Sequence, residues 1–490
     1  METVRGMRVD SAADAVGIFA PNKIESGREA AVVGASNCAA GIEWIEKRFD
    51  MAAKHYTGTW ASVQTHTVPK WYDDAKFGIF IHWGIYSVPA YAPHTWELGA
   101  AEAADWFCNN PYAEWYYNSV NVGRGPGYEH HVRNYGADFK YEDFIPMWKA
   151  ESWDPGQWAE VFKKAGAQYV VLTTKHHDGF CLFPSRYTEF NSVKMGPKKD
   201  ITGELTKAVR NAGLRMGLYY SGLIDWQYAN DPIFEDDDLF GTASPTYAYA
   251  DYSYNQMMEL IDTYEPSVFW NDIGWPKQNE EAMPYLFAHY YNKVPEGVVN
   301  DRFNGRYYDF LTKEYQAGKM DRSQKWEMCR GMGLSFGYNE IEGDDELLPV
   351  PKLIHLLIST VANNGNLLLN IGPKADGTIP AEQIRRLEIL GSWLAVNGEG
   401  IYGTRCSERE SEMRCDGLEL HYTRKDHVLY VFADGLKEGS NTFCIPGFTG
   451  SLKAMDPLVQ IETEPAQEGL RVTVKNYQAD MYAVGLTSEG

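Results

Sequence analysis

The sequence predicts an α/β protein: a (β/α)8-like barrel of the TIM type, followed by a small C-terminal β-sandwich domain. Short apolar segments alternate with helical segments between residues 58 and 402, as in parallel strands joined by helices. Polar or aromatic residues recur where the apolar segments end. After Gly403 the pattern changes to alternating apolar and polar residues with Asp-Gly and Glu-Gly turn signals, which is typical of antiparallel strands.

Six segments of the first region are apolar enough to be strands buried on both faces of a parallel sheet. Their residues are a run ending on His82, then 167–174, 214–221, a run ending on Asp272, 297–300 and 367–371. Helical spacing separates them. The expected helices cover residues 155–164, 204–212, 252–264, 279–291, 353–362 and 381–396. Beyond Gly403 we expect strands at 418–423, 427–432, 470–474 and 481–486.

These elements divide the chain into three parts. Residues 1–57 form an N-terminal extension of unknown role, rich in Ala and Gly. Residues 58–402 form the barrel, and residues 403–490 form the sandwich. The length of 490 residues suits such a division, because single hydrophobic cores rarely grow beyond 250–300 residues.

Composition excludes several classes of partner. The formal net charge of −22 repels phosphate backbones, so we expect no nucleic acid partner. No apolar run is long enough to cross a bilayer, so we expect no membrane partner. The seven cysteines form no CxxC pair, and no signal-peptide pattern opens the chain, which together predict a cytoplasmic location. A homo-oligomer is compatible with the sequence.

Chemically capable residues gather at the ends of the expected strands. In parallel barrels these ends form one rim, where the active site lies. The residues at this rim are His82, His176, His177, Tyr219, Asp272 and Arg302. Six such side chains on one rim indicate a functional site rather than six separate structural roles.

Asp272 ends a buried strand between Trp270 and Trp275. One interpretation is a structural cap, in which the carboxylate bonds a loop amide. The other is a catalytic carboxylate beside aromatic walls that hold a sugar ring. Glycoside hydrolysis requires a second carboxyl. The candidates for it are Glu97, Glu114, Asp225, Glu314 and Glu327, and their neighbours in sequence do not rank them.

His176 and His177 could also be metal ligands. Adjacent residues of a strand point to opposite faces, so both can contact one ion only if the strand has already ended. The alternative is that neutral His, Trp, Tyr and Arg form a hydrogen-bonding and stacking surface for a polyhydroxylated ligand. We favour the second interpretation.

Several ordered motifs resemble the α-L-fucosidases of glycoside hydrolase family 29, over roughly residues 68–402. The matching runs are KFGIFIHWG (76–84), NPYAEWY (110–116), KHHDGF (175–180), WND (270–272), NDR (300–302), TKEY (312–315), WEMC (326–329) and LNIGP (369–373). The resemblance implies a retaining exo-glycosidase with a barrel, a C-terminal sandwich, no cofactor and no metal. Its implied substrate is a fucosylated oligosaccharide or glycoconjugate.

The resemblance also implies roles for individual residues. Asp272 matches the nucleophile, and Glu314 matches the acid/base, which the family takes from a variable loop; Glu327 is the reserve. The implied substrate-binding residues are His82, Glu114, Trp115, His176, His177, Tyr219, Trp270 and Arg302. The chain departs from the family at Phe336, where many relatives have Trp before Gly-Tyr.

Two other functions stay open. The first is a fucose-binding protein of the same shape that has lost turnover. The second is a metal-dependent barrel hydrolase. Linkage preference and the size of the aglycone cannot be inferred from the sequence.

Overall fold

The computed structural model describes residues 55–98, 103–241, 246–315, 322–413 and 417–488. The predicted extension 1–57 lies outside them except for its last three residues. Of these, Tyr56 is buried and packs its ring on Tyr291 at 5.4 Å between centroids.

Eight parallel strands form the central sheet, in the order β5-β4-β3-β2-β1-β8-β7-β6. Strands β1, β2, β4, β5, β7 and β8 are buried at every position, and for all of them except β7 an apolar run predicts this burial. The strands are β1 (Phe77–Ile81), β2 (Tyr169–Lys175), β3 (Arg215–Ser221), β4 (Val268–Asp272), β5 (Val298–Val299), β6 (Leu311–Glu314), β7 (Trp326–Arg330) and β8 (Gly365–Ile371).

The two ends of this sheet meet at β5 and β6. Asn300, just after β5, forms an isolated parallel bridge with Phe310, just before β6. The Asp309 amide donates to the Val299 carbonyl at 2.9 Å, and the Val299 amide donates to the Asp309 carboxylate at 2.8 Å. We call this contact between β5 and β6 the seam. The Asp309 side chain replaces one backbone hydrogen bond there, and the sheet closes into a barrel.

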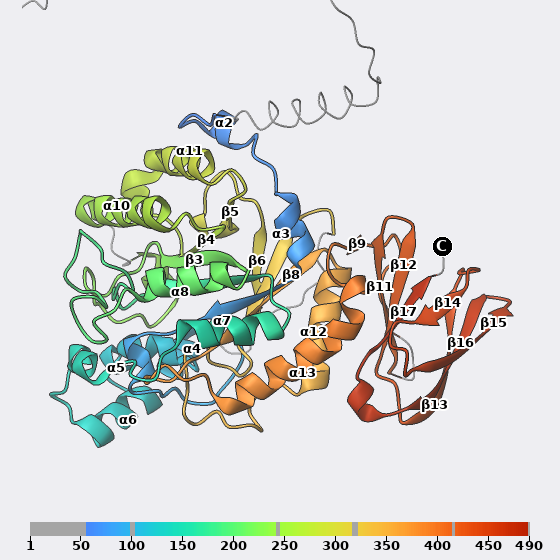
Figure 1. Ribbon diagram of the computed structural model, residues 1–490. Helices are drawn as coiled ribbons and strands as arrows, with labels where there is room; N and C mark the ends of the chain where they lie inside the picture. The colour runs from blue at the N-terminus through green and yellow to red at the C-terminus, as the bar shows by residue number, and fades with distance from the viewer. Residues whose placement is uncertain (1–54, 99–102, 242–245, 316–321, 414–416, 489–490) are drawn as a thin grey trace, which may run out of the picture. The chain divides into compact units, whose positions relative to one another are not determined.

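Helices follow most strands and cover the outside of the sheet (Figure 1). The main ones are α7 (Pro155–Lys164), α8 (Ile201–Asn211), α10 (Tyr247–Tyr264), α11 (Met283–Lys293), α12 (Val350–Ala362) and α13 (Ala381–Asn397). Shorter helices are α2 (Trp60–Val63), α3 (Lys70–Ala75), α4 (Ala103–Cys108), α5 (Tyr116–Asn121), α6 (Pro126–Tyr135) and α9 (Asp236–Gly241). None of the described helices has the length and apolar character required to cross a membrane.

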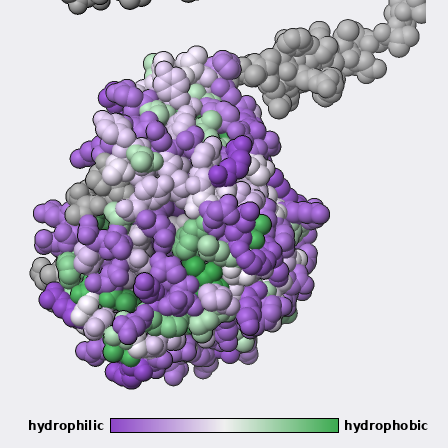
Figure 2. Space-filling model, turned by 90° about the vertical axis from the view of Figure 1, so that its left-hand side faces the viewer, coloured by the Kyte–Doolittle hydropathy of each residue, from purple (hydrophilic) through white to green (hydrophobic). Residues whose placement is uncertain are grey.

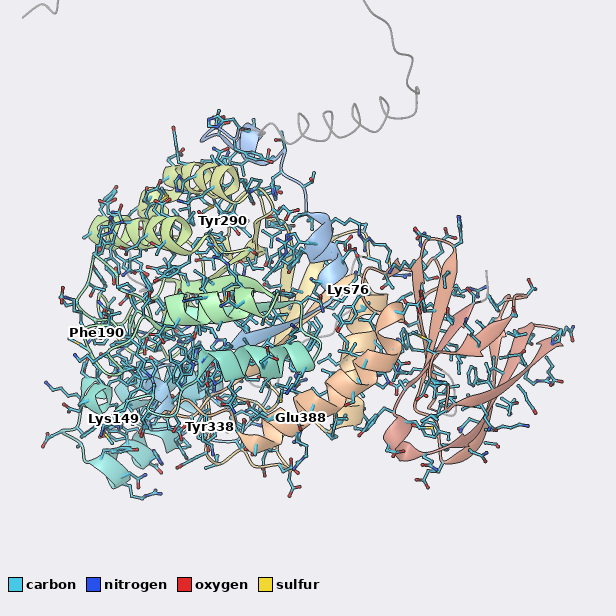
Figure 3. All side chains as sticks on the ribbon, viewed as in Figure 1. Lys76, Lys149, Phe190, Tyr290, Tyr338 and Glu388 are labelled. Atoms are coloured by element: carbon cyan, nitrogen blue, oxygen red, sulfur yellow. The ribbon has the colours of Figure 1, made fainter. Side chains whose placement is uncertain are left out.

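The helix α11 shows how the outer layer is fixed to the sheet. The hydroxyl of Tyr290, which Figure 3 labels, donates to the carbonyl of Pro266 at 2.8 Å, just before β4. The same ring is fully buried. The strand that ends on Asp272 is therefore held at its start by a side chain from a covering helix.

The (β/α) barrel prediction is confirmed, but several bounds differ. α8 starts at Ile201 rather than residue 204, because Asp200 caps it by accepting from the Gly203 amide. α10 starts at Tyr247 rather than 252, capped by Thr246. The expected helix 279–291 is a 3-10 turn, Lys277–Ala282, followed by α11.

Strands β6 and β7 were not predicted as strands. The expectation that Glu314 lies in a loop is wrong, because Glu314 is the last residue of β6 and pairs with Cys329 of β7.

The C-terminal region consists of antiparallel sheets with a core of their own, as predicted. One sheet has the order β10-β11-β12-β17-β14 with β9 added on β11, and the other has the order β13-β16-β15. The strands are β9 (Arg405–Cys406), β10 (Glu412–Met413), β11 (Glu419–Lys425), β12 (Val428–Asp434), β13 (Gly439–Pro446), β14 (Leu452–Ala454), β15 (Gln460–Ala466), β16 (Gly469–Tyr477) and β17 (Val484–Ser488). The exact domain boundary stays a prediction.

Tyr430 and Phe432 of β12 belong to the hydrophobic core of the barrel rather than to that of the sandwich. The indole of Trp393 on α13 donates to the Ala483 carbonyl at 2.9 Å. The core of the barrel therefore extends onto one face of the C-terminal sheets, which keep a separate core on their other side.

Candidate active site

A cavity of about 700 Å³ opens at the C-terminal ends of the barrel strands. This volume suits a small sugar with part of its aglycone. All ten residues that the sequence favoured for catalysis and binding line it: His82, Glu114, Trp115, His176, His177, Tyr219, Trp270, Asp272, Arg302 and Glu314. Figure 2 shows the face on the side of α5, α6 and α10, where small hydrophobic groups lie within a mostly hydrophilic surface.

Six strands or the segments after them deliver these residues, beginning with β1, which His82 directly follows. β3 carries Tyr219, β4 carries Trp270 and Asp272, and β6 ends on Glu314. The strand β2 ends at Lys175, so His176 and His177 lie beyond it and both can face the cavity. Arg302 lies in the 3-10 turn Asp301–Phe303 after β5, and Glu114 and Trp115 lie in the turn Ala113–Trp115.

The Asp272 carboxylate is surrounded by donors. Oδ1 accepts from Arg302 Nη1 at 2.8 Å and from the Ile273 amide at 2.9 Å. Oδ2 accepts from the Tyr219 hydroxyl at 2.7 Å, and His177 Nε2 lies 4.0 Å away. Burial alone would raise the pKa of Asp272, but the Arg302 charge and these donors hold that pKa below its ordinary value. The side chain is therefore anionic at neutral pH.

The backbone after Asp272 is strained. Ile273 has a φ of +63°, a left-handed conformation that β-branched residues rarely adopt. This turn lets the Ile273 amide donate to the preceding carboxylate. Strain of this kind persists where surrounding contacts fix it, and it concentrates at functional sites.

Arg302 joins the two candidate catalytic carboxylates. Its Nη1 donates to Asp272 and its Nη2 donates to Glu314 Oε2, each at 2.8 Å. The guanidinium also lies over the Trp270 ring, 4.8 Å from its centroid. The other oxygen of Glu314 accepts from the Tyr112 hydroxyl at 2.8 Å. One cation thus holds both acids on the same side of the cavity.

The remaining candidate acids lie elsewhere. Glu327 is fully buried below the cavity, where it accepts from Tyr72 at 2.8 Å, Tyr169 at 2.5 Å and Trp270 at 2.9 Å. Its carboxylate oxygens are hydrogen-bonded to these donors inside the barrel, and Glu327 does not line the cavity.

Asp225 and Glu97 also lie outside the cavity lining. Asp225 forms a buried ion pair with Lys175 at 2.9 Å, and Glu97 pairs with Arg330 at 3.3 Å. Glu114 lines the cavity, but it lies on a different element from the acids bridged by Arg302.

The three histidines of the cavity are neutral. Burial lowers the pKa of His82 to about 3, that of His177 to about 4, and that of His176 well below its ordinary value. His82 Nδ1 lies 2.7 Å from Asn370 Oδ1, and His177 Nδ1 lies 2.7 Å from Ser221 Oγ.

His176 Nδ1 is buried and has no hydrogen-bond partner among the described residues. A buried polar atom without a partner costs free energy. A ligand hydroxyl that formed a hydrogen bond with this nitrogen would remove that cost.

Glu114 differs from Asp272 in its charge. Burial raises the pKa of Glu114 to about 8, although the Gly337 amide donates to its Oε2 at 2.7 Å and partly offsets the effect. At neutral pH this side chain carries a proton, and it can donate as well as accept a hydrogen bond.

Aromatic rings complete the cavity wall. Phe336, the residue at which the chain departs from the expected Trp, packs on His82 at 4.9 Å and on Tyr112 at 5.4 Å between centroids. Sequence reasoning missed these other lining residues: Phe80, Leu98, Trp106, Phe107, Tyr112, Leu239, Ile273, Asn304, Thr312, Lys313 and Cys329. Tyr112 could have been found, since it lies within the motif that supplies Glu114.

A metal ion requires at least three converging ligands in most protein sites. Among the described residues, no such group of His, Cys, Asp or Glu occurs in the cavity; the one group found lies at the contact between α12 and β11. The geometry of the cavity therefore suits a polyhydroxylated ligand better than a catalytic ion.

Comparison with known proteins agrees with this geometry. The family model described as Alpha-L-fucosidase matches residues 44–399. An α-L-fucosidase of Dictyostelium discoideum is 38% identical over 370 residues, covering 72% of this chain and 75% of that protein. The plasma α-L-fucosidase of Homo sapiens is 36% identical over 402 residues, covering 79% and 80%.

Solved structures from Thermotoga maritima have the same architecture. An α-L-fucosynthase in complex with α-L-Fuc-(1-2)-β-L-Fuc-N3 is 47% identical, with a TM-score of 0.83, covering 89% of this chain and 100% of that one. An α-fucosidase in complex with fucose is 46% identical, with a TM-score of 0.80 and the same coverage. The chain belongs to the α-L-fucosidase family, glycoside hydrolase family 29.

Proposed function

We propose that this enzyme hydrolyses terminal α-L-fucosyl residues as a retaining exo-glycosidase. Asp272 attacks the anomeric carbon and forms a covalent fucosyl-enzyme, while Glu314 protonates the departing aglycone oxygen. Glu314 then removes a proton from water, which displaces the fucosyl group from Asp272. The observation that carries this proposal is the Arg302 guanidinium, which binds both carboxylates at 2.8 Å.

The shared guanidinium favours retention over inversion. Retaining enzymes hold the two carboxyls about 5–5.5 Å apart, and inverting enzymes about 6.5–9.5 Å apart to admit a water molecule. Two carboxylates on adjacent nitrogens of one planar group are held close together. We therefore expect direct attack by Asp272 rather than attack by an activated water.

The charge of Asp272 supports its role as the nucleophile. A carboxylate must be ionised to attack, and Arg302 and Tyr219 keep it so. These donors also fix its orientation, so that little reorganisation is needed when the bond to the sugar forms.

The proposed fucose-binding residues combine neutral donors and acceptors with aromatic faces. His82, His176 and His177 offer uncharged ring nitrogens, and Glu114 offers a protonated carboxyl. Trp115, Tyr219, Trp270 and Arg302 complete the set. A neutral imidazole can accept a hydrogen bond from one sugar hydroxyl and donate a hydrogen bond to another, which suits a ring with several hydroxyl groups.

The two rival functions are weaker. A fucose-binding protein without turnover needs no second carboxylate bound beside Asp272, yet Glu314 is held there by Arg302 and Tyr112. A metal-dependent hydrolase needs a ligand group that the described residues of the cavity do not form.

The substrate class, a fucosylated oligosaccharide or glycoconjugate, agrees with the fucose and the fucose derivative bound in the related Thermotoga maritima structures. The cytoplasmic location stays a prediction, and one relative is named a plasma enzyme. Homo-oligomerisation also stays open.

The stereochemistry of hydrolysis tests the proposal. An aryl α-L-fucoside is mixed with the enzyme, and proton NMR follows the anomeric signals before mutarotation. We expect α-L-fucose to appear first, since two inversions at the anomeric carbon amount to retention. Early appearance of the β anomer would show single displacement, and no release of the aryl alcohol would favour the binding protein.

A further inference from the structure

A second cluster of ligand-type side chains lies where the barrel contacts the C-terminal sheets. It consists of His355 from α12, Glu419 and His421 from β11, and Asp434 from β12. Donor atoms of the first three residues lie within 4.8 Å of one another. None of the four lines the catalytic cavity. In Figure 1, α12 lies beside β11 and β12.

The strand register places three of these side chains on one face. Glu419 and His421 are two residues apart on β11, so they point the same way. Glu419 pairs directly with Asp434 across the antiparallel ladder of β11 and β12. Two like charges facing each other across a ladder repel, so this arrangement calls for a positive partner.

His355 supplies part of that partner. Its Nδ1 lies 2.6 Å from Asp434 Oδ2 and 4.0 Å from Glu419 Oε2. The charge of His355 can balance the repulsion between the two carboxylates, but it gives His421 no partner.

The position of His421 points to a ligand. Its side chain is only 3% exposed, and its Nε2 has no hydrogen-bond partner among the described residues. That nitrogen lies 3.3 Å from Glu419 Oε2 without the geometry of a hydrogen bond. Its other nitrogen, Nδ1, lies 3.0 Å from Ser411 Oγ. A histidine held at one nitrogen by a polar neighbour, with the second nitrogen free, is the usual form of a metal ligand.

From this geometry we propose that His355, Glu419, His421 and Asp434 bind one Zn²⁺ ion. Two imidazoles with carboxylates suit Zn²⁺, whereas Ca²⁺ and Mg²⁺ prefer oxygen ligands alone. Bonds of about 2.0–2.2 Å in a tetrahedron place ligand atoms about 3.4 Å apart. The 2.6 Å, 3.3 Å and 4.0 Å separations among these ligand atoms each differ from that spacing by less than about 1 Å, so small side-chain movements reach this arrangement.

The site is open to an ion from one side. The side chains of His355 and Glu419 are 31% and 24% exposed, while His421 lies behind them. Because α12 belongs to the barrel and β11 to the C-terminal sheets, the ion would link the two regions. Its role is structural, so it is compatible with metal-independent chemistry in the cavity.

Metal binding to the whole enzyme tests the proposal. The protein is treated with a chelator, dialysed and titrated with Zn²⁺ by calorimetry, and Co²⁺ serves as a spectroscopic probe of tetrahedral coordination. We expect one Zn²⁺ per chain, a visible Co²⁺ absorption that Zn²⁺ abolishes, and a melting temperature that rises with Zn²⁺ but not with Mg²⁺. Turnover of an aryl fucoside well below that temperature should be the same with and without Zn²⁺.

Matched variants locate the site. His355→Gln and Glu419→Gln change partly exposed side chains, and each should weaken Zn²⁺ binding by at least about tenfold. His421→Gln should do the same if it folds. His289→Gln is the control, because His289 also pairs with a carboxylate, Asp262 at 2.8 Å, but belongs to no group of three ligand-type side chains among the described residues. Absence of stoichiometric Zn²⁺ binding, or equal affinity in all variants, would overturn the proposal.

Discussion

The cavity contains two buried carboxyl groups whose surroundings give them opposite charge states. Asp272 accepts hydrogen bonds from a guanidinium, a phenol and an amide, and these hold its pKa below the ordinary value. Glu114 forms no ion pair with any residue in the described part of the chain, and burial raises its pKa to about 8. Different surroundings thus separate an anionic carboxylate, the proposed nucleophile, from a neutral carboxyl, the proposed sugar-binding acid, within one site.

Glu114→Gln should make stability less dependent on pH. The native pKa lies above the ordinary value of 4.5, so the unfolded chain loses this proton first as the pH rises. The wild type therefore loses stability between about pH 4.5 and 8, and the variant lacks this loss. Urea unfolding at pH 5 and pH 8.5 measures the difference, with the exposed Glu160→Gln as control. Parallel pH profiles for wild type and Glu114→Gln would contradict this assignment.

Glu314→Gln should slow hydrolysis according to the leaving group. An acid catalyst matters most when the departing oxygen is basic, so fucosides with sugar aglycones should lose about 10²–10⁴-fold in kcat/KM. Fucosides with an activated aryl group should lose far less in the fucosylation step. Steady-state kinetics on both substrate types measures this ratio.

Glu327→Gln provides the comparison for Glu314. Glu327 lies below the cavity and is bound by Tyr72, Tyr169 and Trp270. Its substitution should lower stability and affect all substrates equally. A loss restricted to poor leaving groups in this variant, and not in Glu314→Gln, would transfer the acid role to Glu327.

At the scale of elements, the seam between β5 and β6 positions Arg302 beside Glu314, the proposed acid/base. Arg302 follows β5 and Glu314 ends β6, and a single bridge connects these two strands. Asp309 sits at the seam, where it accepts from the Val299 amide, from Tyr291 at 2.8 Å and from His66 at 2.8 Å. A buried side chain with donors from three separate elements fixes the relative position of both strands.

Asp309→Ala should lower the free energy of unfolding by about 3–5 kcal/mol, because it leaves several buried donors without a partner. It should also lower kcat in the folded protein, since the seam aligns Arg302 with Glu314. Denaturant unfolding and kinetics measure both effects. The matched control is Asp262→Ala, which removes an exposed His–carboxylate pair and should cost at most about 1 kcal/mol. Equal costs for the two variants would refute the role of the seam.

Strands with apolar sequences were predictable, and those with polar residues were not. β1 and β8 can be identified because nearly every residue is apolar and buried. β7 was missed because it buries Glu327, whose donors come from residues far away in sequence. β6 was missed because it contains the partly buried Thr312 and the exposed Lys313, which are both polar.

The candidate site was largely predictable for a related reason. The C-terminal ends of parallel strands converge, so identifying a strand and its last residues also locates the rim. The contact between Tyr112 and Glu314 could not be predicted in the same way. It joins a loop after β1 to the end of β6, and its geometry depends on tertiary packing rather than on local spacing.

At the scale of the whole molecule, the barrel and the C-terminal sheets share an interior. Phe432 of β12 is fully buried in the core of the barrel, and its ring lies 5.8 Å from that of Trp393 on α13. Since β12 also belongs to the C-terminal sheet, the two regions stabilise each other. We expect them to unfold together in the wild type.

Phe432→Ala should lower the free energy of unfolding by about 3–5 kcal/mol by leaving a cavity between the two regions. It should also lower the temperature at which fucosidase activity is lost, although Phe432 lies outside the catalytic cavity. Calorimetry and residual activity after heating measure this coupling. If the variant lost activity at the same temperature as the wild type, the barrel would be independent of the C-terminal region.

Covalent labelling of Asp272 is the most direct test of the proposed mechanism. The reagent is a 2-deoxy-2-fluoro-L-fucosyl fluoride. Its fluorine at C2 slows both formation and hydrolysis of the covalent intermediate, whereas the fluoride leaving group at C1 keeps formation fast. The intermediate therefore accumulates. Mass spectrometry of the digested protein should find one fluorofucosyl group on the peptide that contains Asp272, and none in Asp272→Ala. A label on another residue, or turnover of the reagent without any covalent adduct, would contradict the assignment of Asp272 as the nucleophile.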